Sequence, residues 1–129
     1  MITRLLTAML LAVALLGATG CERRTEADGV SYSADIQPIL DDHCSACHTG
    51  DGEGLEASGF STESYVTVMK GTRFGSMVEP GDPLSSSLYR LVSGREVHPS
   101  IRMPHGEAML PESDIALIET WIRQGAQGD

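Results

Sequence analysis

The sequence predicts an all-α fold of three to five short helices. Apolar residues recur three or four positions apart in several segments, which is the spacing of one helical face. Glycines follow most of these segments, at the positions where helices commonly end. No stretch shows the strict alternation of apolar and polar residues that a half-buried strand requires.

The first predicted helix covers residues 32–47. Ser33 or Asp35 can cap it, and Pro38 falls in its first turn, where a missing N–H group is tolerated. Its apolar positions are Ile36, Ile39 and Leu40. The glycine-rich and acidic residues 49–59 that follow are predicted to form a loop.

Two short helices are predicted next. The first is capped by Ser61 and ends at Gly71, and the second starts at Ser85 or Ser86 and ends at Gly94. Their apolar positions are Tyr65, Val66 and Met69 in the first, and Leu88, Leu91 and Val92 in the second.

The last predicted helix has Pro111 at its first position and ends at Gly125. Its buried stripe is formed by Ile115, Ile118 and Ile122, with Trp121 beside it. Residues 95–109, which precede it, contain two prolines and no periodicity, so we expect an ordered loop there.

Residues 1–20 have the organisation of a secretory signal peptide, with one charge at Arg4, an apolar run over residues 5–16, and then small residues. Cys21 follows the small residues 18–20, a pattern that resembles the lipobox of bacterial lipoproteins. An ordinary signal-peptidase site and a retained hydrophobic anchor are the alternatives. We therefore expect export to the periplasm or cell envelope and membrane anchoring through lipid on Cys21.

The mature chain is predicted to consist of a short tether, residues 21–29, and one domain, residues 30–129. Loss of Arg4 with the signal moves the net charge from −9 to −10. This acidic balance disfavours nucleic acids and anionic lipid surfaces as partners, and favours basic or neutral proteins. Aromatic residues make up only 5% of the chain, which suits a small domain that buries an apolar prosthetic group.

The most informative motif is Cys44-Ser45-Ala46-Cys47-His48. Cys-x-x-Cys-His is the pattern by which a c-type haem is attached through two thioether bonds and ligated by histidine. Positions three and four apart share a helix face, so the two thiols and the imidazole can meet one flat ligand. A thioredoxin-like disulfide would lie beside a βαβ pattern, and a zinc site would need a second ligand pair; the sequence has neither. The motif therefore predicts one covalent haem c, bound by Cys44 and Cys47, with His48 as an iron ligand.

The second iron ligand is predicted to be Met103. It lies in the non-periodic stretch and precedes Pro104, which holds a preceding residue extended. A thioether ligand also raises the reduction potential, which suits electron transfer. Met69 and Met109 have sequence positions that favour packing in the core. The alternatives that remain open are Met77, His98 and His105.

Residues from about 30 to 127 resemble a mono-haem class I cytochrome c. The closer resemblance is to a module type that recurs in large exported proteins of some environmental bacteria. The matching segments are residues 35–40, 44–48, 80–83, 87–88, 103–104 and 121–126. The resemblance implies crossing N- and C-terminal helices, and iron ligation by His48 and Met103.

These features together favour a non-enzymatic carrier that transfers single electrons between redox partner proteins at a membrane surface. A peroxidase-like enzyme with an open iron is the main alternative, with His98 or His105 as its acid–base residue. A bis-histidine redox subunit and a sensory or structural haem module are others. Arg73, Arg90 and Arg102 are either donors to a haem carboxylate or simply solvated.

Overall fold

The structure is a computed structural model that describes residues 29–129 of the chain. Over these residues it confirms the all-α class, since they form helices and no strand. The predicted signal peptide 1–20, the lipidation candidate Cys21 and nearly all of the tether 21–29 lie outside the described residues. Between residues 29 and 129, no helix combines the length and the apolar character needed to cross a membrane.

Eight helical elements follow one another along the described residues. They are η1 (Tyr32–Ile36), α2 (Gln37–His43), α3 (Ser45–His48), α4 (Glu53–Ser58), α5 (Tyr65–Lys70), α6 (Ser87–Ser93), η2 (Pro99–Ile101) and α7 (Glu112–Arg123). Six of them are α-helices, more than the three to five predicted, because α3 and α4 are separate short pieces. The first element, η1, is a π-helical turn that continues directly into α2.

Helix α4 lies where the sequence predicted only a loop, and that prediction was wrong for residues 53–58. Gly59 ends the helix in the left-handed conformation, with a φ of 76°. Arg73 donates from its guanidinium to the carbonyl oxygens of Glu56 and Ala57. Those carbonyls have no partner within a helix this short, so a distant arginine completes it. A contact of this kind leaves no local signal in the sequence.

The start of α6 agrees with the prediction, since Ser86 is its N-cap residue, whereas the caps of η1 and α5 differ from the predicted ones by a few residues. Ser31, not Ser33 or Asp35, caps η1, because its hydroxyl accepts from the N–H of Ala34. Ser64, not Ser61, caps α5 in a capping box with Thr67. The helix ends were predicted more accurately. Gly71 and Gly94 follow the last residues of α5 and α6, and Gly125 lies two residues beyond α7.

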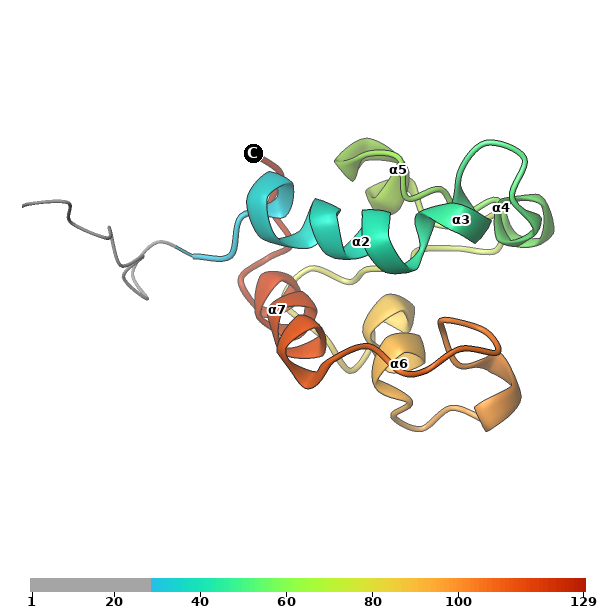
Figure 1. The fold of residues 1–129 in the computed structure, drawn as a ribbon. Coiled ribbons are helices and arrows are strands. Elements are labelled where there is room, and N and C mark those ends of the chain that lie inside the picture. Colours follow the sequence, from blue (N-terminus) through green and yellow to red (C-terminus); the bar gives the residue numbers. More distant parts are fainter. Residues whose placement is uncertain (1–28) are drawn as a thin grey trace, which may run out of the picture.

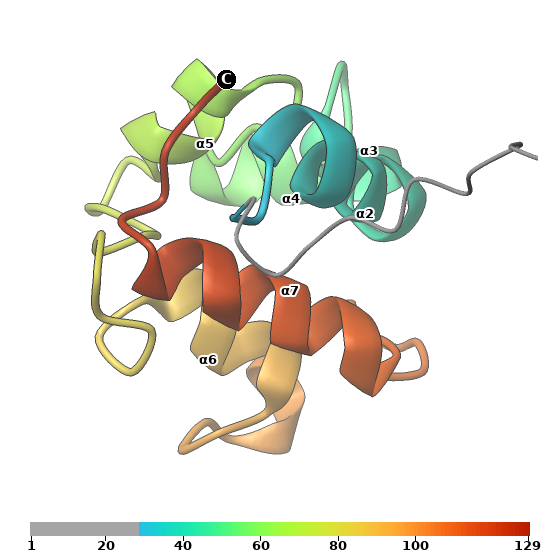
Figure 2. The same ribbon diagram turned by 90° about the vertical axis from the view of Figure 1, so that its left-hand side faces the viewer.

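The elements form two layers (Figures 1 and 2). One layer contains η1 and α2 to α5, and the other contains α6 and α7. Helix α7 contacts both α6 and η1, so the first and last parts of the described chain pack together. The large apolar side chains that are fully buried come from both layers and are Ile36, Leu40, Val68, Val78, Tyr89, Val92, Ile118, Trp121 and Ile122.

Most of the predicted apolar stripes face this core. In α7, Ile118, Trp121 and Ile122 are buried, whereas Ile115 is only partly buried against the core. Val66 of α5 is an exception, because 73% of its surface is exposed. The predicted core position of Met109 was also wrong, since 45% of its surface is exposed.

Candidate functional site

The motif residues 44–48 form a single tight turn at the end of α2. The N–H groups of Cys47 and His48 both donate to the carbonyl oxygen of Cys44, over 3.1 Å and 2.9 Å. This turn places the two thiols and the imidazole around one pocket. Both cysteines are free thiols. Burial, with a smaller contribution from Cys47, raises the pKa of the Cys44 thiol to about 11, so the thiol is uncharged at neutral pH.

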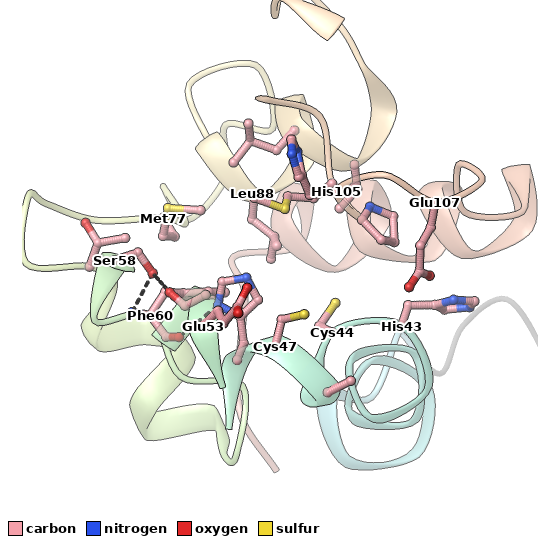
Figure 3. Close-up of a pocket in the computed structure, with 18 residues that line it drawn as sticks. His43, Cys44, Cys47, Glu53, Ser58, Phe60, Met77, Leu88, His105 and Glu107 are labelled. Atoms are coloured by element: carbon pink, nitrogen blue, oxygen red, sulfur yellow. Dashed lines mark hydrogen bonds between the residues drawn. The ribbon is translucent and has the colours of Figure 1, made fainter. Parts of the chain in front are cut away.

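The pocket lies between the two layers and has a volume of about 460 Å³, within the range of small-molecule and cofactor sites. Residues of α2, α3 and α4 form one wall, and residues of α6 with the 103–107 loop form the other. In Figure 3 the sulfur atoms of Cys44 and Cys47 point into the space below Leu88 and His105. The walls are mainly apolar, so the pocket suits a large, flat, mostly apolar ligand.

The imidazole of His48 is held from two sides. Its Nδ1 lies 3.1 Å from the carbonyl oxygen of Phe60, which can only accept, so Nδ1 is the nitrogen that donates and Nε2 is the one left for a metal. The ring also packs edge-on against the Phe60 ring, with 5.5 Å between the centroids. On the other side it lies against Gly54, where an added Cβ would be 2.9 Å from Nε2. The histidine is therefore fixed as a metal ligand requires.

Two methionines, Met77 and Met103, line the pocket. Both are tied to α6 through the backbone. The N–H of Met103 donates to Leu91 over 3.1 Å, and the carbonyl of Met77 accepts from Leu88 over 2.9 Å. The peptide bond between Met103 and Pro104 is cis. The pocket thus offers two thioethers, and the stronger sequence candidate is one of them.

Of the other histidines and methionines considered as iron ligands, only His105 lines the pocket. His105 lines the pocket at its edge, whereas His98 is outside it and pairs with Ser100. Met69 packs against the core, as expected from its helical spacing. Met109 lies outside the pocket, with its sulfur 3.9 Å from a guanidinium nitrogen of Arg102.

The three candidate arginines do not line the pocket. Arg73 binds the end of α4, as described above. Arg90 donates to the carbonyl oxygen of Glu96. Arg102 packs against Gly94. The structure therefore gives none of these three guanidinium groups a role in the pocket.

Some pocket residues were missed in the sequence. His43 lines the pocket beside Cys44, and its Nε2 is 3.4 Å from a carboxylate oxygen of Asp114 on α7. Glu107 also lines the pocket, and Figure 3 shows it at the same end as His43. No motif spacing marks His43 and Glu107, because they line one pocket only when the two layers pack together.

The residues present fit a covalently attached haem. Two free thiols and one oriented imidazole share a wall, and thioethers are available elsewhere around the same space. Gly54 leaves room for the imidazole that any side chain would take. Among the described residues, no group of three or more His, Cys, Asp or Glu side chains is placed to hold a metal ion by itself.

The comparisons with known proteins agree with this site. Residues 44–107 match the family model described as Planctomycete cytochrome C. The match begins at the first cysteine of the motif and ends at Glu107, so it contains every residue that lines the pocket except His43. Searches of curated proteins and of solved structures gave no match. The matched family, the helical fold and the pocket agree, and the chain therefore carries a cytochrome c-type module whose cofactor is a covalently bound haem c.

Proposed function

We propose that the protein is an electron carrier whose iron is ligated by His48 and Met103. The observation that carries the proposal is the joint placement of an oriented imidazole and Met103 around one pocket. When bound, the haem supplies an Fe(III)/Fe(II) couple that takes up and releases one electron. In such a carrier the chain would supply both protein ligands of the iron, so that gain and loss of the electron would change the structure little.

Four of the pocket residues have distinct parts in this proposal. Cys44 and Cys47 would form the thioether bonds. His48, with its Nδ1 proton held by Phe60, would present Nε2 to the iron. The thioether of Met103 is a soft ligand that favours the reduced iron and raises the potential. The bond from its N–H to Leu91 keeps the methionine beside α6.

The Met103 assignment is tested by exchange of each pocket methionine for leucine. Met103→Leu should keep the covalent haem but lose the far-red methionine–iron charge-transfer band and lower the midpoint potential. Met77→Leu is the matched control, because Met77 lines the same pocket and is tied to the same helix. Loss of the band in Met77→Leu, with the band intact in Met103→Leu, would assign the ligand to Met77 instead.

A peroxidase-like enzyme is the second candidate, because His105 lies at the edge of the pocket. An enzyme of this kind needs an iron position open to small molecules and a nearby acid–base residue. Rapid binding of carbon monoxide or cyanide by the untreated protein would favour the enzyme. Binding that becomes rapid only in Met103→Leu would favour the carrier.

We also propose that the protein is exported and anchored by lipid on Cys21. The support is the signal-like segment 1–20 and the small residues that precede the cysteine. The anchored domain would exchange electrons with redox partner proteins of basic or neutral surface. Labelling of cells with a radioactive fatty acid should mark the unsubstituted protein and should not mark Cys21→Ser. An unsubstituted haem protein that takes up no label would refute the lipid anchor.

A further inference from the structure

We propose that Gln37 is a positioning residue that sets the strength of the hydrogen bond on His48, and thereby the reduction potential. This inference rests on the proposed role of His48 as an iron ligand. Gln37 begins α2 and lies outside the pocket. It reaches the histidine through the buried segment formed by residues 60–62.

The side-chain amide of Gln37 has three partners. Its Nε2 donates to the carbonyl oxygen of Thr62 over 3.0 Å and to Asp41 Oδ1 over 2.7 Å. Its Oε1 accepts from the hydroxyl of Tyr32 over 2.8 Å. A carbonyl and a carboxylate can only accept, whereas the tyrosine hydroxyl can donate, so these partners allow one orientation of the amide. The amide is therefore a fixed link between η1, α2 and Thr62.

The segment that is bound by Gln37 forms two hydrogen bonds with His48. The carbonyl oxygen of Phe60 binds the imidazole Nδ1 over 3.1 Å, and the N–H of Thr62 donates to the backbone carbonyl of His48 over 3.1 Å. Phe60 and Thr62 are 4% and 0% exposed, so water does not replace these bonds. The position of the segment thus decides how well Phe60 accepts from the imidazole.

The hydrogen bond on Nδ1 matters for the iron because it makes the imidazole a more basic ligand. A more basic ligand favours oxidised iron and lowers the reduction potential. If Gln37 releases Thr62, the Phe60 carbonyl moves, the bond to Nδ1 weakens, and the potential rises. General loosening that admits water would favour the more highly charged oxidised iron instead. The two effects have opposite signs.

The test compares Gln37→Met with Tyr32→Phe in the haem-loaded protein. Gln37→Met keeps the length and charge of the side chain but loses the bond to Thr62. Tyr32→Phe removes one bond from the same amide and leaves the bond to Thr62 in place. We expect a higher midpoint potential and faster hydrogen exchange at the Thr62 amide in Gln37→Met, and neither change in Tyr32→Phe. Gln37→Asn, which is one methylene too short, should give the same signs if the methionine variant fails to mature.

An unchanged or lowered potential in a fully haem-loaded Gln37 variant would overturn the inference, as would an equal rise in Tyr32→Phe. These outcomes leave the proposed function intact, provided that the unsubstituted protein shows histidine ligation in its spectrum. If the unsubstituted protein lacks His48 ligation, the proposed function fails first, and the Gln37 role fails with it.

Discussion

The absence of a side chain at Gly54 leaves space for the His48 imidazole. A Cβ there would lie 2.8 Å from Cε1 and 2.9 Å from Nε2 of the ring, and 2.9 Å from the carbonyl oxygen of Cys47. The carbonyl is backbone and the ring is confined by Phe60, so neither can move away easily. The glycine therefore belongs to the histidine site, although it is six residues along the chain.

Gly54→Ala should destabilise the haem-loaded protein by about 1–3 kcal/mol, the usual cost of overpacking, and change the axial-ligand spectrum. Denaturant unfolding and an absorbance spectrum measure the two effects. Gly50→Ala is the control: it has a φ of 57° and open space around it, so it should cost ~1–2 kcal/mol of backbone strain and leave the spectrum unchanged. A normal spectrum in Gly54→Ala would show that the ring does not depend on this space.

For single residues, the sequence predicts the sites of haem attachment and the neighbours that lie close along the chain. The thiols and imidazole of residues 44–48 could be identified because three and four positions along a turn share a face. The contacts of His48 with Phe60 and Gly54 could not, because they depend on how the chain returns after α3. Gln37 was missed for the same reason, since its partners lie in η1 and in the 60–62 segment.

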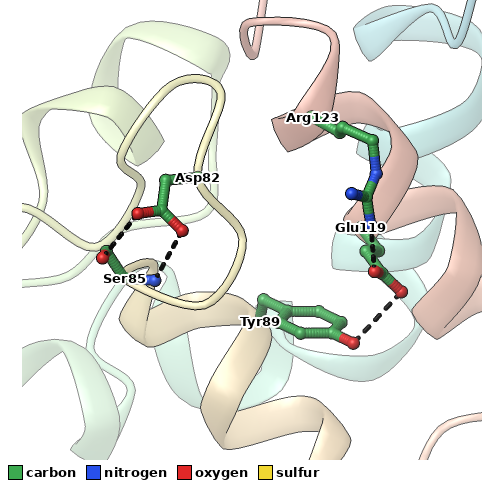
Figure 4. A network of polar contacts seen from close by, with 5 residues as sticks. All are labelled: Asp82, Ser85, Tyr89, Glu119 and Arg123. Carbon is green, nitrogen blue, oxygen red and sulfur yellow. Dashed lines mark hydrogen bonds and ion pairs between the residues drawn. The ribbon is translucent and has the colours of Figure 1, made fainter.

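Helices α6 and α7 are joined by a buried tyrosine (Figure 4). Tyr89 is 1% exposed, and its hydroxyl donates to Glu119 Oε2 over 3.1 Å. Glu119 also forms an ion pair with Arg123 along α7. Since α6 provides Leu88, Leu91 and Val92 to the pocket, this bond helps to fix one pocket wall.

Tyr89→Phe should lower the free energy of unfolding at neutral pH by roughly 0.5–1.5 kcal/mol, the usual worth of one hydrogen bond. Burial first, and then the bond and charge of Glu119, raise the pKa of Tyr89 above its ordinary value of 10.0. The tyrosine thus stabilises the fold fully below pH 10, and this contribution is lost as the pH rises further, because the unfolded chain ionises first.

The stability difference between the two proteins, followed by denaturant unfolding, should therefore shrink above pH 10. A difference that stays constant into the alkaline range would show that the pKa of Tyr89 is not raised in the folded protein. A difference that grows would contradict the raised pKa.

Helix ends were easier to predict than helix starts. Glycine marks the ends of α5 and α6 because the left-handed or otherwise unusual backbone there strains other residues. Two serines compete for the start of α5, and Ser64 caps it instead of Ser61 because Thr67 completes a capping box with Ser64. Helix α4 has no periodic apolar signal in the sequence, and the carbonyl oxygens of Glu56 and Ala57 at its C-terminal end are bound by the distant Arg73.

Across the whole molecule, the two ends of the domain are tied to each other. The side-chain oxygen of Gln124 accepts from the N–H of Val30 over 2.8 Å. Asp129 accepts from the hydroxyl of Ser31 and from the N–H of Ser33. The Tyr65 hydroxyl donates a hydrogen bond to the carbonyl oxygen of Ala126. These bonds keep η1 against α7, which in turn sets the position of α2 and the haem motif.

Asp129→Asn should destabilise the protein at neutral pH. The hydrogen bonds from Ser31 and then Ser33 hold the pKa of the carboxyl below its ordinary value of 3.8. The ionised carboxylate therefore stabilises the fold above pH 3.8, and the contribution is lost as the pH falls through the lower, folded value. Thermal unfolding from pH 7 to pH 3 should show the two proteins converging in acid.

Covalent binding of one haem through Cys44 and Cys47, with the iron next to His48, underlies the proposed function. Its most direct test is a haem-stained denaturing gel together with an alkaline pyridine spectrum of the matured protein. We expect one haem per chain that stays with the polypeptide after denaturation, and loss of covalent haem when both cysteines are replaced by alanine. A matured protein without colour, or a haem that separates on denaturation, would contradict it.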